Sequence, residues 1–293
     1  MNQHLKGVYE IIEVEGGNRS QAKNSGIFHA ASSLVAFTDS DCDPPEDWLA
    51  RLVESLPEHE SVAGVGGVSL SMASSSSLQK AIDGVFSTYL GSLGSPSLSS
   101  FPENQKRFAR AISGHNCIFR KDALLEVEGF DERFELNEDT DICARLAKRG
   151  YALLLDKSSF VFHSRRRSLG SFVKQFFWYG IGRMRSMLTS ARYVDIRILA
   201  LFLLALGCGL TAILNWQLAA VALSAYVFLV LLSSLEGAIR VSSIRLMPML
   251  VLLFVLEHFA YLFGLFSGLL MGPWKKNKEY GPIKIRKHVV GAK

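Results

Sequence analysis

The sequence contains few cysteines, and one long stretch of it is almost without charge. Its four cysteines, Cys42, Cys117, Cys143 and Cys208, form no CxxC pair, which argues against a zinc site and against a disulfide framework. Isolated cysteines are typical of a reducing compartment, and most of them are small buried hydrophobic side chains. No apolar segment of the signal-peptide type follows Met1, so we expect no secretory leader.

Charge is scarce in residues 198–271, which have only four charged side chains in 74 positions. Three apolar runs in this part of the chain, 196–214, 217–235 and 246–271, are each long enough to cross a bilayer. In the rest of the chain about 25% of the residues are charged, which is typical of a soluble domain. We therefore expect one soluble domain joined to a membrane part, and not a polytopic transporter.

The formal net charge of +5 is unevenly distributed along the chain. Residues 1–162 sum to −8, residues 163–197 to +7 and residues 272–293 to +6. Basic segments on both sides of the apolar runs favour contact with anionic lipid headgroups. We expect no nucleic-acid partner, because the basic residues adjoin the apolar runs and do not cover the globular part.

The soluble part alternates between strand-like and helix-like patterns. Strands are expected at 8–14, 34–38, 62–70, 117–120, 152–155 and 159–162. Helices are expected at 19–31, after Pro44-Pro45, and at 74–92, 121–127 and 139–150. This alternation predicts an α/β domain, a mostly parallel sheet with flanking helices, whose ligands bind beyond the carboxyl ends of the strands.

Three carboxylates, Asp39, Asp41 and Asp43, follow the predicted strand 34–38 at alternate positions. Carboxylates this close repel one another unless a cation neutralises them. Carboxylate oxygens are ligands of hard divalent ions such as Mg²⁺ or Mn²⁺, and such an ion would in turn hold a diphosphate. The alternative is a solvated turn in which the acids favour the N-terminus of the next helix.

A second acidic segment, 138–141, stands at the start of the helix predicted for 139–150 and follows the Gly-Phe-Asp-Glu segment 129–132. A carboxylate fixed at the mouth of a site can accept a proton from a hydroxyl nucleophile. Acidic residues also stabilise the N-termini of helices without any catalytic role. The segment alone leaves both interpretations open.

Taken together, these segments resemble the family 2 inverting glycosyltransferases over about residues 18–185. The similarity rests on five motifs in the order that the family shows. They are A-K-N-S-G at 22–26, D-S-D at 39–41, S-G-H-N at 113–116 with Arg120, G-F-D-E at 129–132 and E-D-T-D at 138–141.

The resemblance implies a GT-A fold, a nucleotide-sugar donor and a divalent cation, Mg²⁺ or Mn²⁺, as cofactor. It places Asp39 and Asp41 on the cation and the donor diphosphate. It makes Asp43 a third metal ligand or a donor contact, and it puts Lys23 and Asn24 on the donor side.

The same resemblance makes Asp139, with Glu138 beside it, the catalytic group that deprotonates an acceptor hydroxyl for attack with inversion. It places Gly114, Asn116 and Asp141 on the acceptor side of the site.

Two basic positions follow the last predicted strand. His163 is placed to approach the metal or the diphosphate, and its alternative is a half-buried polar residue at a strand end. Arg165 is placed to hold a donor phosphate, and contact with lipid headgroups remains open for it.

The segment 174–183 resembles that of non-processive, membrane-tethered members of the exopolysaccharide type, because it lacks the Q-x-x-R-W pattern of processive ones. We therefore expect transfer of one sugar to a hydroxyl of a lipid-linked saccharide. Residues 1–17 do not resemble the strands that hold the nucleotide in the family. We expect this first part of the domain to be incomplete.

The predicted organisation has four parts. They are a GT-A-like domain at 1–167, an interfacial amphipathic helix at 168–195, transmembrane helices within 196–271 and a basic tail at 272–293. We expect a multi-pass protein of the cell membrane with a cytoplasmic catalytic domain. The alternatives are an inactive, truncated glycosyltransferase that acts as a binding or scaffold subunit, and a small-ligand channel or transporter.

Overall fold

The computed structural model of the chain describes residues 9–72, 74–92, 106–275 and 280–290. The chain divides into two compact units. The first comprises Met1–Met72, Ser100–Ser164 and Lys275–Lys293, and the second comprises Ala73–Ser99 and Arg165–Trp274. Among the described residues, 74–92 thus belong to the helical unit and 280–290 to the unit that contains the sheet.

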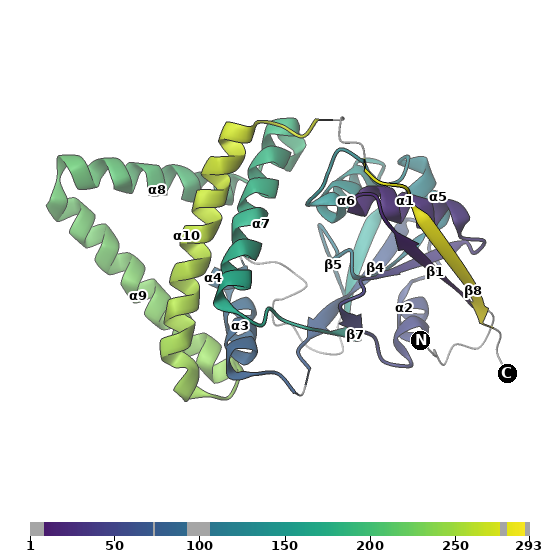
Figure 1. Cartoon of the computed structure of the whole chain (residues 1–293), viewed down its shortest axis with the longest axis horizontal. Coiled ribbons are helices and arrows are strands. Elements are labelled where there is room, and N and C mark those ends of the chain that lie inside the picture. Colours follow the sequence, from purple (N-terminus) through teal and green to yellow (C-terminus); the bar gives the residue numbers. More distant parts are fainter. Residues whose placement is uncertain (1–8, 73, 93–105, 276–279, 291–293) are drawn as a thin grey trace. The chain divides into compact units, whose positions relative to one another are not determined.

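A six-stranded sheet forms the centre of the first unit, in the order β2-β6-β4-β7-β3, with β5 pairing with β7 (Figure 1). Its strands are β2 (Leu34–Thr38), β3 (Cys42–Asp43), β4 (Val62–Leu70), β5 (Lys106–Phe108), β6 (Asn116–Arg120) and β7 (Ala152–His163). Its helices are α1 (Arg19–His29), α2 (Trp48–Ser55), α5 (Lys121–Glu126) and α6 (Glu138–Lys148). The predicted α/β domain with flanking helices is confirmed.

The directions of the strands differ from the prediction. Strands β4 and β7 are parallel, whereas the pairs β2–β6, β4–β6, β3–β7 and β5–β7 are antiparallel. The prediction of a mostly parallel sheet is therefore wrong. The prediction failed at β6, which lies between β2 and β4 and is antiparallel to both. The chain between β4 and β6 contains α3, α4 and β5 and not a single crossover helix. The four buried residues in a row of β6 fit either direction.

The last strand of this sheet is also longer than expected. We predicted two short strands with a break near Asp156, but β7 is continuous over twelve residues. The Asp156 carboxylate is buried, where it accepts a hydrogen bond from Ser55 Oγ at 2.6 Å and lies 3.6 Å from Lys106 Nζ. These partners satisfy a polar side chain that the sequence alone places in a turn.

Side chains of the sheet form a core on each of its faces. Phe119 of β6 and Leu155 of β7 pack with residues of α1, α5 and α6. Ile118 and Leu154, one position away, pack with α2 on the opposite face. This alternation follows from the period of two along a strand, and it produces three layers with the sheet in the middle.

A separate two-stranded antiparallel sheet joins β1 (Tyr9–Glu15) to β8 (Lys284–Val290) (Figure 1). Lys287 of β8 forms an ion pair with Glu10 of β1, and Arg286 lies 4.0 Å from Glu13. The basic tail was predicted to contact lipid headgroups. Lys287 and Arg286 of this tail thus have acidic partners in β1.

Helices make up the second unit. They are α3 (Ser77–Ser87), α4 (Tyr89–Ser92), α7 (Leu169–Thr189), α8 (Ile196–Leu214), α9 (Trp216–Arg240) and α10 (Met247–Met271). The helix predicted for residues 74–92 is thus two helices, α3 and α4, in the structure.

The most extensive helix contact joins α7 to α10, which run side by side (Figure 1). Glycines let the two backbones touch: a Cβ atom on Gly180 would lie 2.2 Å from the Tyr261 carbonyl oxygen, and one on Gly264 would lie 2.1 Å from the Phe177 carbonyl oxygen. The helix predicted as interfacial therefore buries one face, with Phe172 among its side chains, within the helical unit.

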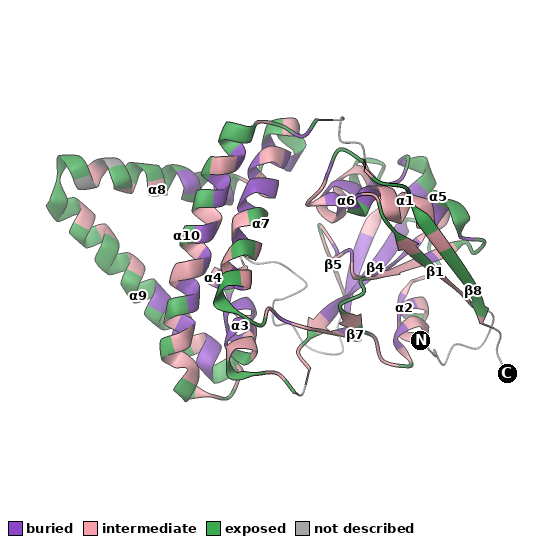
Figure 2. Ribbon diagram, in the orientation of Figure 1, coloured by how far each residue is buried: buried purple, intermediate pink, exposed green. Residues whose placement is uncertain are grey.

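Among the described residues, two helices are long and apolar enough to cross a membrane, Trp216–Arg240 and Ile244–Met271. A third span was predicted at 196–214. Helix α8 has these bounds, and its described apolar stretch is Ile196–Gly209. Figure 2 shows that most of α8 and α9 is exposed, which leaves large apolar side chains uncovered by protein.

Candidate active site

The first acidic segment forms a turn between β2 and β3. The Cys42 amide donates to the Asp39 carbonyl oxygen at 3.1 Å, and β3 then pairs with the end of β7. In this pairing Cys42 lies opposite His163. The turn therefore brings residues from two distant parts of the chain to one edge of the sheet.

Asp41, Cys42 and His163 are the group in the described chain whose ligand atoms lie close enough for a metal ion, all within 4.8 Å of one another. His163 Nε2 is 3.5 Å from Asp41 Oδ2. Burial, together with the charges of Asp41 and Asp39, raises the pKa of the Cys42 thiol to about 11. Since the thiol is protonated at neutral pH, the carboxylate oxygen and the imidazole nitrogen are the better ligands.

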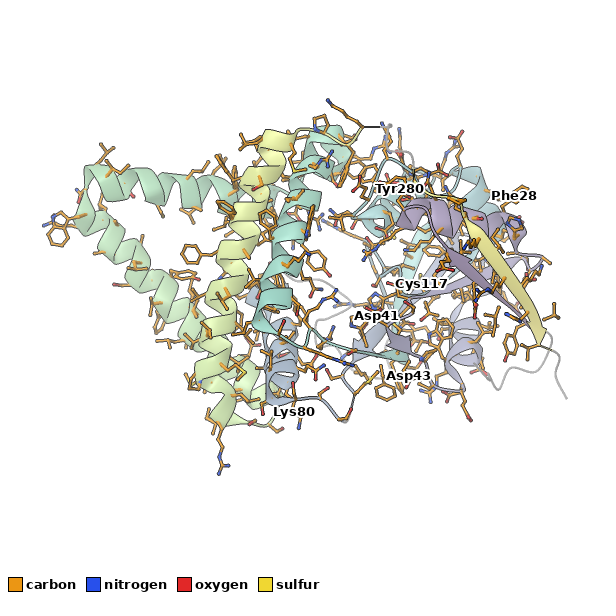
Figure 3. The ribbon with its side chains drawn as sticks, viewed as in Figure 1. Phe28, Asp41, Asp43, Lys80, Cys117 and Tyr280 are labelled. Atoms are coloured by element: carbon orange, nitrogen blue, oxygen red, sulfur yellow. The ribbon has the colours of Figure 1, made fainter. Side chains whose placement is uncertain are left out.

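The other two acids of the turn differ in position. Asp39 is exposed and directly follows β2, which ends at Thr38. Asp43 follows Cys42 in β3, so its side chain points to the other face of the strand, and it is exposed. Asp41 and Asp43 are both marked in Figure 3. The structure does not bring Asp43 into the group formed by Asp41, Cys42 and His163.

The second acidic segment forms the first turn of α6. Asn137 precedes it in the left-handed region, with φ 64°, and the helix begins at Glu138. Glu138 is buried and accepts from Lys23 Nζ at 2.9 Å. Asp141 is buried and pairs with Arg145 at 2.6 Å. Both acids thus have a cation of the chain itself as partner.

Asp139 lies between these two paired acids and differs from them. Its Oδ1 accepts from the Thr140 amide at 2.7 Å, and its Oδ2 accepts from the Gly114 amide at 3.4 Å. In the described part of the chain it forms no ion pair within 4.0 Å. Asp139 is therefore the carboxylate of this turn that retains capacity to accept a proton.

Asn24 holds the Gly-Phe-Asp-Glu segment against α1. Its Oδ1 accepts from the Phe130 amide at 2.7 Å, and its Nδ2 donates to the Phe130 carbonyl oxygen at 2.8 Å. Gly129 has φ 66°, and a Cβ atom there would lie 2.6 Å from Asn24 Oδ1. The amide predicted to contact the donor makes its bonds to this turn.

Asn116 also makes its bonds within the protein. It is fully buried in β6, accepts from Trp48 Nε1 at 2.8 Å and donates to the Val68 carbonyl oxygen at 2.9 Å. Its side chain therefore links α2, β4 and β6. Gly114, two residues earlier, contacts Asp139 through its amide.

Arg165 belongs to the helical unit and not to the sheet unit. Its Nε donates to Asp83 Oδ1 at 2.7 Å, and its guanidinium lies 5.1 Å from the ring centroid of Phe86. The predicted phosphate-binding guanidinium is buried among these partners.

His115 is a residue of the site that the sequence interpretation did not assign. Ser69 Oγ lies 2.6 Å from its Nε2, and Ser113 Oγ lies 2.6 Å from its Nδ1. Its ring centroid is 5.2 Å from that of His163. The signal for it is its place in the S-G-H-N motif, directly before a residue of the buried strand β6.

Comparison with known proteins gives both a family and individual relatives. A family model described as "Glycosyl transferase family group 2" matches residues 34–267. The "Succinoglycan biosynthesis protein ExoA" of Rhizobium meliloti (strain 1021) is 31% identical over 191 residues, which are 64% of this chain and 56% of that protein. A "Pre-mycofactocin glycosyltransferase" of Mycobacterium tuberculosis (strain ATCC 25618 / H37Rv) is 26% identical over 159 residues, which are 54% of this chain and 33% of that protein. The chain thus spans about half the length of the first relative and a third of the second.

Two solved structures are more distantly similar. The mannosyltransferase PcManGT from Pyrobaculum calidifontis, in complex with GDP-Man and Mn²⁺, has a TM-score of 0.48 and 15% identity, over 84% of this chain and 66% of that one. GalNAc-T7 with UDP, GalNAc and Mn²⁺ has a TM-score of 0.38 and 14% identity, over 62% of this chain and 39% of that one. Similarity at this level does not identify a ligand.

Proposed function

The chain belongs to glycosyl transferase family group 2, and from this membership and the geometry of its site we propose that it moves one sugar from a nucleotide-sugar donor to a hydroxyl of an acceptor saccharide, with inversion at the anomeric carbon. Asp139 is the base of this reaction. It accepts the proton of the acceptor hydroxyl while the hydroxyl oxygen bonds to the anomeric carbon and the nucleoside diphosphate departs.

The remaining residues of the site support two other tasks. Asp41 and His163 offer the oxygen and nitrogen donors that fit a divalent cation, Mg²⁺ or Mn²⁺, and Asp39 is a further carboxylate of the same turn. Such a cation, when bound, supplies positive charge to the departing diphosphate. Asn24 and Asn116 hold the surrounding segments in place through buried or partly buried hydrogen bonds of their side-chain amides.

One observation carries this proposal: in the acidic turn of α6, Glu138 and Asp141 are neutralised by cations of the chain, whereas Asp139 is held by amide hydrogen bonds. A carboxylate held in this way is oriented but still available for a proton.

The test is Asp139→Asn, which preserves the shape of the side chain and removes the base. Transfer should fall by about 10²–10⁴-fold. Thermal stabilisation by nucleoside diphosphate with Mn²⁺ should persist, because the donor does not need the base to bind. Asp122→Asn, an acid in the first turn of α5, is the matched control and should transfer normally. Unchanged transfer in Asp139→Asn would contradict the proposal.

We propose further that the acceptor is lipid-linked and that the protein lies in the cell membrane with its sheet unit on the cytoplasmic side. Support comes from the two helices long enough to span a bilayer, from the exposed apolar side chains of α8 and α9, and from the basic segment 163–197. Transferred radioactive sugar should appear in the organic-extractable fraction of membranes. Label found only in water-soluble saccharide would refute the lipid-linked acceptor.

A further inference from the structure

Lys23 of α1 is a buried ammonium at the second acidic turn. Its side chain is 12% exposed and that of Glu138 is 6% exposed, with 2.9 Å between Nζ and Oε1. The same Nζ lies 5.1 Å from the ring centroid of Phe130. A buried ammonium costs free energy unless such partners compensate it, so this contact holds α1 to the start of α6.

Gly114 stands between this ammonium and the base. A Cβ atom on Gly114 would lie 2.4 Å from Lys23 Nζ and 3.4 Å from Asp139 Cβ. The Gly114 amide also donates to Asp139 Oδ2 at 3.4 Å. Any larger residue at this position would push the lysine away, so the close approach of Lys23 to the turn depends on a glycine here.

Charge at the turn is balanced by the lysine. Burial alone lowers the pKa of Lys23, but the carboxylates of Glu138 and Asp139 outweigh burial and raise it, so the lysine stays charged. Asp139 also interacts electrostatically with Cys117 of β6 and with Cys143 of α6, and Asp141 lies two residues further along α6. Burial raises the pKa of both thiols, which are therefore neutral, and Asp141 has its own cation, Arg145.

We propose that Lys23 is the positioning residue of the base: it neutralises Glu138, supplies positive charge beside Gly114 and Asp139, and does not contact the nucleotide-sugar donor. This inference rests on the proposed function, in which Asp139 is the base. It reassigns a residue that the family resemblance placed on the donor side.

Without the lysine, Glu138 and Asp139 are adjacent carboxylates in a partly buried turn. Like charges at this distance favour protonation of one of them, so the pair without its lysine would take up a proton at a higher pH. If the lysine bound the donor instead, its loss would weaken donor binding and leave the ionisation of Asp139 unchanged. The two roles therefore separate in the pH profile and in the division between kcat and KM.

The experiment measures kcat and donor KM across pH for the full chain in detergent, with Lys23→Met, Lys23→Arg and Lys121→Met. In Lys23→Met we expect kcat at neutral pH to fall about tenfold and the acid limb of its pH profile to move up by about one unit, with donor KM within about twofold. Lys23→Arg should restore the acid limb. Lys121→Met is the control, since Lys121 Nζ binds only the Ala30 carbonyl oxygen among the hydrogen bonds described.

A double variant distinguishes the loss of charge balance from general misfolding. Lys23→Met combined with Glu138→Gln removes both charges, so its melting temperature should recover most of what Lys23→Met loses. Its acid limb should also return toward that of the wild type, because the like charge beside Asp139 is gone. A raised donor KM with an unmoved acid limb, or a double variant without recovery, would overturn the inference.

Failure of the inference and failure of the proposed function are distinguishable. Full transfer by Asp139→Asn contradicts the proposed function. An inactive Asp139→Asn together with a Lys23→Met that keeps the wild-type pH profile contradicts the role of Lys23 alone.

Discussion

The two acidic segments of the site are similar in composition, but they differ in the source of their cations. Asp39 and Asp41 are exposed in a turn, and Asp43 is exposed in the strand β3 that follows. Among the described ion pairs, the basic partner of this segment is His163, which lies 3.5 Å from Asp41. Glu138 and Asp141 are buried and already paired with Lys23 and Arg145. In the proposed function, the first segment binds a cation from solution, whereas the second has its cations built in and leaves Asp139 for chemistry.

The largest effect on activity is expected from a substitution in the first acidic segment. Asp41→Asn should abolish Mn²⁺-dependent transfer, with little change in melting temperature because the side chain is 48% exposed. Wild-type protein at 100 times the dissociation constant of Mn²⁺ should gain about 2.7 kcal/mol in a thermal-shift assay. Asp41→Asn should gain none. Asp43→Asn is the matched control, and an equal loss there would contradict the geometry of β3.

Removal of a cation from the second acidic segment should instead destabilise the folded protein. Arg145→Met leaves Asp141 buried without its cation, which should lower the free energy of unfolding by about 3–5 kcal/mol. Urea denaturation measures this change. The Arg145→Met, Asp141→Leu double variant removes both charges and should recover much of the loss. A stable Arg145→Met protein would mean that the cation of this segment is dispensable.

Asp156 extends the comparison to a buried carboxylate that is held mainly by hydrogen bonds. Its donors are Ser55 and Ser158, and the nearest cation, Lys106, lies 3.6 Å away. Burial raises the pKa of Asp156, but bonds from Ser55 and Ser158 and the nearby Lys106 outweigh burial and lower it. Its stabilisation is therefore present above the unfolded pKa and is lost as the pH falls through the lower folded pKa. Asp156→Asn should cost about 1–3 kcal/mol at neutral pH. Unfolding curves of variant and wild type should converge in acid, and a constant gap would contradict this account.

The smallest effect is expected at the surface. Lys287→Ala removes the ion pair between β8 and Glu10, and a partly exposed pair of this kind contributes about 0–1 kcal/mol. Its cost should decrease in high salt, because screening weakens exposed charges more than buried ones. Thermal unfolding at two salt concentrations measures this. A salt-independent loss of several kcal/mol would place Lys287 with the buried pairs.

Local patterns predicted the elements well. The strands β2 and β4 have the predicted bounds, because alternating or continuous apolar runs are properties of neighbouring residues. The motifs likewise located both acidic segments. Strand direction was not predictable in this way, since β6 is buried on both faces and its pattern is the same in either direction.

Long-range partners account for the rest of the site. Lys23 and Glu138 are 115 residues apart, and the periodicity of neither segment indicates the other. The same holds for Cys42 and His163, which meet only because β3 pairs with the end of β7. The sequence could name the acids, but which of them are already neutralised depends on contacts that form only in the folded chain.

The pairing of β1 with β8 has a consequence for the order of events during synthesis. Tyr9 pairs with Val290, and Glu15 pairs with Lys284. All the helices of the second unit are therefore translated before β1 meets its partner. At about 5–20 residues per second, β1 waits more than about ten seconds for β8. During this interval the edge of β1 that pairs with β8 in the folded chain lacks its partner strand.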